Sequence, residues 1–435
     1  KKQKMIDIKL IREKPDLVKR NIKKKFQIHK LKLVDEIIEK DNKWRKLKYE
    51  VDQLRKSRNE ISERINKAKK SKDEMFANEL IKKAQSIPDQ IKKSEEQTEK
   101  LEHEIKELML EIPNIISKKT PVGKDETKNK IVRKWGKIKK LKNVKNHVEL
   151  IEEFGLGNFE KSAEVSGNGF YYLKDKLALL NQALIRFAID FMKKKKYEYI
   201  ETPLMLNELA IFASMDKKAI QESVYKIENE DLHLIGTAEQ SLLAMHTNDV
   251  INENELPKKY FSYSMCFRRE IGSHGINEKG LWRTHQFNKI EQFIFCKPED
   301  SEKFYDEMLK NSEEILRSLK LPYRIVEFCS GALADWKHRS HDLEVYRPTI
   351  KDYGEVMSLS NCTDYQTRKL NIKLIDKHGN RRFLYTLNNT ALATSRIMVA
   401  ILENFQEKNK IKIPKVLWKY TGFKEIISGL DTTNS

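Results

Sequence analysis

The first hundred residues carry apolar side chains at the spacing of packed helices. From about Ile8 to Pro113 the chain is polar, and in two stretches apolar positions recur alternately four and three residues apart, which is typical of a coiled-coil seam. The first seam consists of Leu47, Val51, Leu54, Arg58, Ile61, Ile65 and Ala68. The second consists of Leu80, Ala84, Ile87, Ile91, Ser94, Thr98, Leu101, Ile105, Leu108 and Ile112. Because a polar turn at 69–73 separates them, we predict an antiparallel helical hairpin that projects as an arm, with a kink or a lost hydrogen bond at Pro88.

The rest of the chain has a different pattern. Residues 177–191 read as an amphipathic helix, and a final helix is expected at about 390–404. Strands are expected at 197–203, 231–236, 259–268, 284–295, 323–329, 341–347, 355–359 and 382–387. Because strands follow strands, the pattern predicts an antiparallel α+β sheet and not a Rossmann fold. The expected domains are a helical domain at 1–113, a lysine-rich linker at 114–160 and a sheet domain at 161–435.

Composition adds an excess of positive charge. The chain has 85 Lys and Arg against 65 Asp and Glu, a formal net charge of +20. That excess suits a polyanionic partner, although a lysine-rich genome composition explains it equally well. The four cysteines are Cys266, Cys296, Cys329 and Cys362, and their wide spacing predicts reduced thiols and neither a zinc site nor a disulfide framework.

No targeting or membrane segment is expected. No apolar run approaches the ~20 residues that cross a bilayer, and Lys1–Lys4 lack the apolar core of a signal peptide. We therefore expect a cytoplasmic protein. An organellar matrix is the alternative if residues 1–4 are the remnant of a longer precursor and not of a tag.

Basic residues follow the predicted hairpin towards its tip. They are Arg55, Lys56, Arg58, Arg64, Lys67, Lys69, Lys70 and Lys72. A solvated coiled-coil face is the usual explanation of such charges, and a surface that grips a phosphate backbone is the alternative.

Residues 265–295 carry the most chemistry. Two apolar runs flank a loop that contains Gly272, Gly275 and Gly280, which predicts an antiparallel pair of strands. Alternation then places Arg268 and Glu270 on one face of the first strand. Phe287, Lys289 and Glu291 share a face of the second strand. A guanidinium for phosphate, a ring for a base and carboxylates for amino groups predict a site for a nucleotide and an amine. A hairpin with solvated charges is the plainer alternative.

This string resembles motif 2 of class II aminoacyl-tRNA synthetases, specifically the seryl-tRNA synthetase family. Further strings similar to that family occur at 5–15, 201–203 (the end of motif 1), 236–240, 342–344, 355–358, 360–368 and 387–396 (motif 3). The resemblance implies an α+β fold in which an antiparallel class II catalytic core follows an N-terminal antiparallel coiled-coil arm. It also implies a serine–tRNA ligase, which activates L-serine with ATP to seryl-adenylate and transfers it to the 3′ end of serine tRNA.

The resemblance assigns residues to a serine pocket. They are Thr237, Ala238, Glu239, Arg268, Glu291, Asn388 and Thr390. Glu291 would take the substrate ammonium. Thr237 with Gln240 three residues later is also a capping-box pattern, so a helix cap is a second role for Thr237.

The resemblance also assigns an ATP site. Its residues are Arg268, Arg269, Glu270, Thr284, Phe287, Glu355, Val356, Met357, Ser358 and Arg396. Arg268 would bind the α-phosphate, Glu270 the adenine and Arg396 the γ-phosphate, while Phe287 would stack on the ring. Glu355 and Ser358 would hold Mg²⁺ between phosphates, since hard oxygen ligands suit that cation. Arg268, Glu355 and Arg396 are the expected catalytic residues, and no zinc is expected.

The partners implied by the resemblance are serine tRNA, with selenocysteine tRNA left open, and a second copy of the chain in a homodimer. Arg55, Lys56, Arg64, Lys69 and Lys70 are the residues expected to contact tRNA. Two alternatives are a catalytically silent synthetase-like tRNA-binding protein and an amino-acid ligase acting on a carrier protein, though relatives of the latter kind lack the arm. Residues 332–341 depart from the family pattern, so no site residue is expected there.

Overall fold

The structure, a computed structural model, describes residues 7–271 and 279–428. The chain divides into two compact units. One consists of residues 7–23 and 27–113, and the other consists of residues 24–26 and the described residues from Asn114 onward. None of the helices in these described ranges is both long and apolar enough to cross a membrane.

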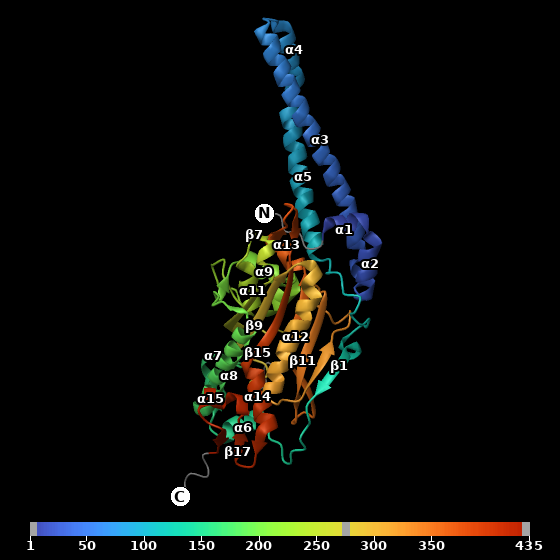
Figure 1. Ribbon diagram of the computed structural model, residues 1–435. Coiled ribbons are helices and arrows are strands. Elements are labelled where there is room, and N and C mark those ends of the chain that lie inside the picture. Colours follow the sequence, from blue (N-terminus) through green and yellow to red (C-terminus); the bar gives the residue numbers. More distant parts are fainter. Residues whose placement is uncertain (1–6, 272–278, 429–435) are drawn as a thin grey trace. The chain divides into compact units, whose positions relative to one another are not determined.

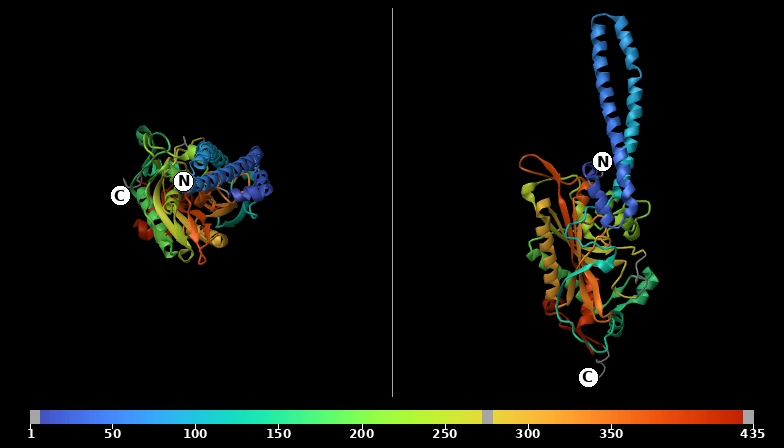
Figure 2. Two further views of the ribbon diagram at one scale, coloured as in Figure 1. Left: turned by 90° about the horizontal axis from the view of Figure 1, so that it is seen from above. Right: turned by 90° about the vertical axis from the view of Figure 1, so that its right-hand side faces the viewer.

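The first unit is helical. Its helices are α1 (Ile8–Glu13), α2 (Pro15–Lys24), α3 (Leu31–Lys70), α4 (Glu74–Ala84) and α5 (Ile87–Leu110). The chain runs out along α3 and returns along α4 and α5, both of which pack on α3 (Figures 1 and 2). The predicted helical hairpin is confirmed, and α3–α5 are called the arm below.

The arm is held together by the seams that the sequence predicts. Val51 and Ala68 of α3 are buried, as are Leu80 of α4 and Ile91 and Ile105 of α5. These apolar contacts sit between two polar outer faces, which is how a helix pair without a surrounding domain removes apolar surface from water.

Pro88 ends up where a proline is tolerated. The returning half of the arm is two helices with a break at 85–86, and Pro88 lies in the first turn of α5. Backbone N–H groups of a first turn have no partner within the helix, so proline forfeits no helical hydrogen bond there. The expected kink is therefore a helix boundary.

The second unit is built on an eight-stranded sheet with the order β1-β10-β11-β12-β15-β9-β8-β4. The strands are β1 (Lys130–Trp135), β4 (Glu198–Tyr199), β8 (Lys258–Phe267), β9 (Gln286–Cys296), β10 (Tyr323–Glu327), β11 (Arg339–Arg347), β12 (Asp352–Thr363) and β15 (Tyr385–Ala393). All neighbours are antiparallel except β4 and β8. The predicted α+β architecture is confirmed.

Three long helices belong to the core of this unit: α8 (Asp175–Lys194), α12 (Ser301–Ser318) and α14 (Thr394–Phe405). Their apolar residues, such as Leu184, Met308 and Met398, pack with Ile290 and Leu359 of the sheet. The sheet and α12 are seen side by side in Figure 1.

Shorter elements complete the unit. The helices are α6 (His147–Glu153), α7 (Phe159–Ser166), α9 (Glu208–Ser214), α10 (Lys217–Ser223), α11 (Ala238–Ala244), α13 (Tyr365–Leu370) and α15 (Trp418–Thr421). The strands are β2 (Gly157–Asn158), β3 (Tyr172–Leu173), β5 (Met205–Leu206), β6 (His233–Leu234), β7 (Val250–Asn252), β13 (Lys373–Ile375), β14 (Arg381–Phe383), β16 (Gln406–Glu407), β17 (Lys410–Lys412) and β18 (Glu425–Ile427).

Two expectations need correction. The last helix begins at Thr394, because residues 390–393 continue strand β15 instead of starting a helix as expected. The segment expected as a linker, 114–160, contributes β1 to an edge of the main sheet and also contains α6. An edge strand needs little apolar surface, and β1 is exposed along most of its length. Its lysine-rich sequence therefore lacks the hydrophobic pattern that predicts a strand.

Candidate active site

A cavity of about 460 Å³ lies over strands β9, β12 and β15. It gathers most of the residues that the sequence assigns to substrate binding: Thr237, Glu239, Arg268, Glu270, Thr284, Phe287, Glu291, Glu355, Val356, Ser358, Asn388, Thr390 and Arg396. Ala238, Arg269 and Met357 do not line it. Met357 belongs to the apolar core, and Ala238 is fully buried in α11. Of the three glycines in the loop expected between the two strands, Gly272 and Gly275 lie outside the described residues.

Strand β9 supplies one wall by simple alternation. Phe287, Lys289 and Glu291 line the cavity, as period-two geometry predicts. Ile290 between them points to the apolar core.

Strands β12 and β15 reach the cavity through one extra residue each. On β12, Glu344 of the neighbouring strand pairs with Glu355 and Leu343 pairs with Met357, so Val356 has no partner. This β-bulge brings Glu355 and Ser358 to one face, although a spacing of three residues places them on opposite faces of a regular strand. On β15, Ala391 is unpaired in the same way.

Arg268 follows directly after β8. Its Nε donates to the carbonyl oxygen of Gly236 at 3.1 Å, and its guanidinium lies 5.3 Å from the centre of the Phe287 ring. Glu270, two residues later, pairs with Arg283, whose Nη1 is 2.6 Å from Glu270 Oε2. No feature of the sequence pattern singles out Arg283.

The acidic end of the cavity is a buried, paired cluster. Thr237 Oγ1 donates to Glu291 Oε2 at 3.1 Å, and Lys289 Nζ lies 2.6 Å from the same oxygen. Lys289 Nζ also donates to Thr237 Oγ1 at 2.8 Å. All three side chains are buried, so the lysine balances a carboxylate that is costly to bury alone. Thr237 also caps α11 by accepting from the backbone N–H of Glu239, so the expected helix cap is present on a residue that lines the cavity.

Glu239 is held by two amides. Its Oε1 accepts from Gln366 Nε2 at 2.7 Å and from Asn388 Nδ2 at 2.9 Å. Gln366 is itself oriented by Thr386, whose hydroxyl donates to Gln366 Oε1 at 2.6 Å. Burial and the neighbouring charge of Glu291 raise the pKa of Glu239 to about 7, against the opposing effect of the Gln366 hydrogen bond. Gln366 lies within one of the family strings, but nothing in its sequence context indicated this role.

A guanidinium–carboxylate pair marks the other end. Arg396, in the first turn of α14, lies 3.1 Å from Glu355 Oε2, and its Nη1 donates to the Glu355 carbonyl oxygen at 2.9 Å. Burial opposes ionisation of Glu355, but the charge and hydrogen bond of Arg396 outweigh it and lower the pKa. Asp342 pairs with Ser358 across the strands, and burial with the charge of Glu355 raises its pKa well above the usual range.

The donors for a cation at this end are few. Glu355 and Ser358 offer hard oxygen atoms, and among the described residues no three His, Cys, Asp or Glu side chains converge as a metal cluster. One carboxylate and one hydroxyl fit a cation that keeps most of its ligands from water and phosphate, as Mg²⁺ does, better than a protein-enclosed ion.

The divergent segment reaches the cavity as well. Trp336 and Lys337 line it, although no site residue was expected between 332 and 341. Asn114 fixes this segment, because its backbone N–H donates to the Asp335 carbonyl at 2.7 Å and its Nδ2 to the Trp336 carbonyl at 3.0 Å. Only tertiary contacts bring these positions into the site, so a sequence comparison restricted to motifs misses them.

Comparison with known proteins agrees with this geometry. The model of the seryl-tRNA synthetase N-terminal domain matches residues 5–116, and that of the class II tRNA synthetase core domain (G, H, P, S and T) matches residues 223–405. The chain is 43% identical to the serine–tRNA ligase of Methanocella arvoryzae over 420 residues, which are 96% of this chain and 98% of that protein. The chain belongs to the seryl-tRNA synthetase family.

Solved members of the seryl-tRNA synthetase family share the whole fold. The Pyrococcus horikoshii enzyme complexed with ATP gives a TM-score of 0.92 at 40% identity, covering 98% of this chain and 100% of that one. The cytoplasmic enzyme of Naegleria fowleri in complex with AMP gives 0.88 at 33% identity, with the same coverage. No comparison favours the catalytically silent alternative.

The arm residues expected to contact tRNA differ in their surroundings. Arg55 Nη2 lies 2.5 Å from Glu95 Oε1 across the two helices, and Arg64 lies over the ring of Phe76. Lys56 lies 3.9 Å from Glu60. Lys69 and Lys70 are exposed in the last turn of α3, at the tip of the arm.

Glu239 provides a test of the electrostatics of the cavity. Because the pKa of Glu239 is higher in the folded than in the unfolded state, the protonated carboxyl stabilises the fold. This contribution to the free energy of unfolding is complete below the unfolded pKa and is lost as pH rises through about 7. Glu239→Gln keeps the oxygen that accepts from Gln366 and Asn388 but cannot ionise. Between pH 5 and pH 8 we expect the wild type to lose up to about 3 kcal/mol of its free energy of unfolding relative to this variant.

Urea unfolding at several pH values measures this difference. Glu228→Gln, at an exposed position, controls for removal of one negative charge. A difference between wild type and Glu239→Gln that stays constant from pH 5 to pH 8 contradicts the raised pKa.

Proposed function

We propose that this chain is a serine–tRNA ligase that activates L-serine with ATP and then transfers the seryl group to tRNA. The observation that carries the proposal is that one cavity joins a buried acidic cluster around Thr237 to the guanidiniums of Arg268 and Arg396. An amino acid bears an ammonium that suits the former, and a triphosphate suits the latter. The serine–tRNA ligase of M. arvoryzae, with its full-length similarity, supports the same assignment.

The serine pocket combines selectivity for charge with selectivity for the hydroxyl. Glu291 takes the substrate ammonium. Thr237 and Glu239 line the pocket beside it, and Asn388 and Thr390 close it. Ala238 does not line the pocket and contributes only as the buried residue of α11 between Thr237 and Glu239. Arg268 meets the substrate carboxylate. Alanine is rejected because polar groups buried around the missing hydroxyl are left unpaired.

The ATP site occupies the other part of the cavity. Arg268 binds the α-phosphate, Arg396 the γ-phosphate and Glu270 the adenine, with Phe287 as the stacking ring. Glu355 and Ser358 would hold Mg²⁺, which would neutralise phosphate charge. Of the remaining members of the predicted set, Thr284 and Val356 line the cavity. Arg269 and Met357 do not line it, and their part in the site is limited to the backbone next to Arg268 and Val356.

Activation needs no protein nucleophile. The serine carboxylate attacks the α-phosphorus in line, forming the seryl-adenylate, and pyrophosphate leaves. Arg268 stabilises negative charge that develops on the transferring phosphorus, and the two ends of the cavity hold the reactants at short range. In the second step a ribose hydroxyl at the 3′ end of tRNA attacks the adenylate carbonyl, and AMP leaves.

The arm binds the tRNA, with Arg55, Lys56, Arg64, Lys69 and Lys70 as phosphate contacts. Serine tRNA is the substrate, and selenocysteine tRNA is the second candidate. The active protein is a homodimer in which residues 201–203 lie at the subunit interface. Four buried free cysteines are compatible with a reducing compartment such as the cytoplasm.

Serine-dependent exchange of labelled pyrophosphate into ATP tests the first step. We expect serine, of all twenty amino acids, to give the strongest exchange in the presence of Mg²⁺. A stronger signal with threonine, or no signal with any amino acid, contradicts the proposal.

Arg268→Ala tests the electrostatic role of its guanidinium. Loss of one such charged contact to the transition state lowers the rate by ~10²–10³-fold, so we expect exchange to fall by that factor while the thermal midpoint changes little. An Arg186→Ala variant, whose exposed side chain lies on α8, serves as control. Near-normal exchange by Arg268→Ala removes this residue from the mechanism.

Excision of about residues 45–108 tests the division of labour between the units. The seams of the arm pack on each other, so the shortened chain retains its catalytic unit and its serine-dependent exchange. Transfer of serine to tRNA collapses, because the phosphate contacts are lost. In the intact chain, the binding constant for tRNA falls steeply as salt rises. Each phosphate contact contributes ~0.7–0.9 to the slope of its logarithm against the logarithm of the salt concentration. Full-rate aminoacylation by the arm-deleted chain contradicts this division.

A further inference from the structure

Residues 280–284 carry several contacts of the candidate ATP site without belonging to a helix or strand. The carbonyl oxygen of Trp282 accepts from Arg396 Nε at 3.3 Å. Arg283 pairs with Glu270, and Thr284 is buried in the cavity wall. Whatever fixes this short segment therefore fixes the partners of Glu270 and Arg396.

His147, in the first turn of α6, makes a direct bond to this segment. Its Nε2 accepts from the backbone N–H of Leu281 at 3.1 Å, and Leu281 is fully buried. The preceding residue is Gly280, where a Cβ atom would stand 2.5 Å from the same Nε2. The close approach of the imidazole thus requires glycine at this position.

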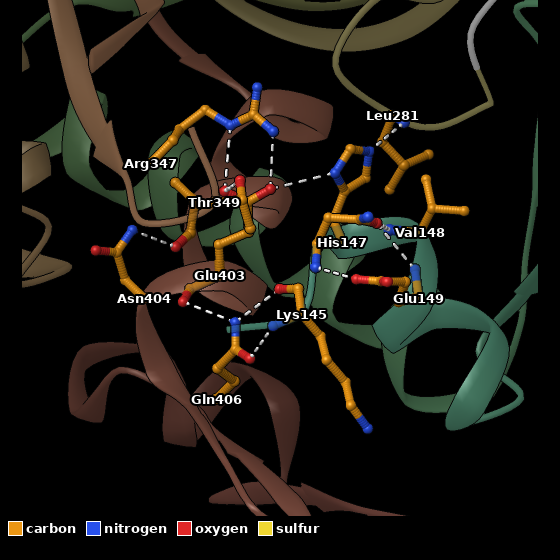
Figure 3. Close-up of polar contacts among 12 residues, drawn as sticks. Lys145, His147, Val148, Glu149, Leu281, Arg347, Thr349, Glu403, Asn404 and Gln406 are labelled. Atoms are coloured by element: carbon orange, nitrogen blue, oxygen red, sulfur yellow. Dashed lines mark hydrogen bonds and ion pairs between the residues drawn. The ribbon is translucent and has the colours of Figure 1, made fainter. Parts of the chain in front are cut away.

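Glu403 orients the imidazole from the other side. Glu403 Oε1 lies 3.3 Å from His147 Nδ1, and the carboxylate also accepts from Arg347 Nη2 at 2.8 Å and from Thr349 Oγ1 at 2.8 Å (Figure 3). Glu403 is fully buried, which opposes ionisation, but these hydrogen bonds outweigh burial and lower its pKa. An ionised carboxylate can only accept, so Nδ1 carries the proton and Nε2 is left as the acceptor for Leu281.

The same cluster reaches Trp282 by a second route. The guanidinium of Arg347 lies 4.3 Å from the centre of the Trp282 ring, and that of Arg396 lies 5.5 Å from it. Gly354 lets the ring lie close, since a Cβ there would be 2.3 Å from a ring carbon. Arg396 and Glu403 are seven residues apart on α14, and therefore on one face of that helix.

We propose that His147 is a positioning residue of the ATP site: held by Glu403, it fixes the backbone of Leu281 and thereby sets Trp282 and Arg283 against Arg396 and Glu270. Neither His147 nor Glu403 lines the cavity. The inference rests on the proposed function only in naming ATP as the ligand. It deepens that function by extending the ATP site to a buried cluster behind it.

Other contacts hold α6 in place, so the histidine can be changed without removing the helix. Asn146 and Glu149 form a capping box, and Gln406 exchanges hydrogen bonds with Lys145 in both directions, each at 2.9 Å (Figure 3). Thermal midpoints of the variants therefore report separately on folding.

The experiment compares three replacements of His147 in the full-length chain. His147→Gln retains an acceptor near the position of Nε2, whereas His147→Asn retains a donor only near Nδ1, and His147→Phe retains neither. We expect the KM for ATP in pyrophosphate exchange, and the Kd for ATP from calorimetric titration without serine, to rise ~5–20-fold in the Asn and Phe variants. The Gln variant stays within about threefold of the wild type, and the KM for serine changes little in all three.

His378→Phe, at an exposed position, is the matched control. An unchanged Kd for ATP in the Phe variant overturns the inference, as does a Gln variant that behaves like the Phe variant. So does an equal rise in both KM values accompanied by a large fall in the thermal midpoint. Absence of serine-dependent exchange in the wild type instead overturns the proposed function, while the calorimetric Kd still tests the role of His147.

Discussion

The catalytic unit depends on burying charge on one face of a sheet whose other face is apolar. Ile290 on β9 packs into the core, while Lys289 and Glu291 on either side of it turn into the cavity and are almost as deeply buried. Isolated buried charges are prohibitively costly, so each must have a partner. The lysine–glutamate–threonine cluster and the amide-held Glu239 meet this requirement at one end of the site. The Arg396–Glu355 pair, which is partly exposed, forms the other end.

This constraint also explains which parts of the site are visible in the sequence. Alternation along 284–295 places Phe287, Lys289 and Glu291 together because β9 is regular, and the structure agrees. The arm can also be predicted from the sequence, because a heptad pattern repeated over many turns outweighs local exceptions such as Arg58.

The parts that were missed depend on long-range geometry. Gln366 holds Glu239 by a hydrogen bond and Trp336 lines the cavity, and in both cases tertiary contacts decide the role. Alanine and leucine at 390–393 favour a helix, whereas pairing with β9 makes this segment the end of strand β15. The edge strand β1 is mostly exposed and lysine-rich, so its sequence lacks the hydrophobic pattern of a strand.

The bulge in β12 has a consequence for how this site can change over evolution. Val356 offers no chemical group to a substrate, and many apolar residues fill its place equally well. Glu355 lies opposite Glu344 and Ser358 lies opposite Asp342, and neither pairing involves Val356. Removal of this one residue leaves Glu355 and Ser358 two positions apart, which on a regular strand is again one face. Loss of the bulge residue is therefore tolerated at this point, whereas straightening of the strand with all of its residues retained places the carboxylate and the hydroxyl on opposite faces.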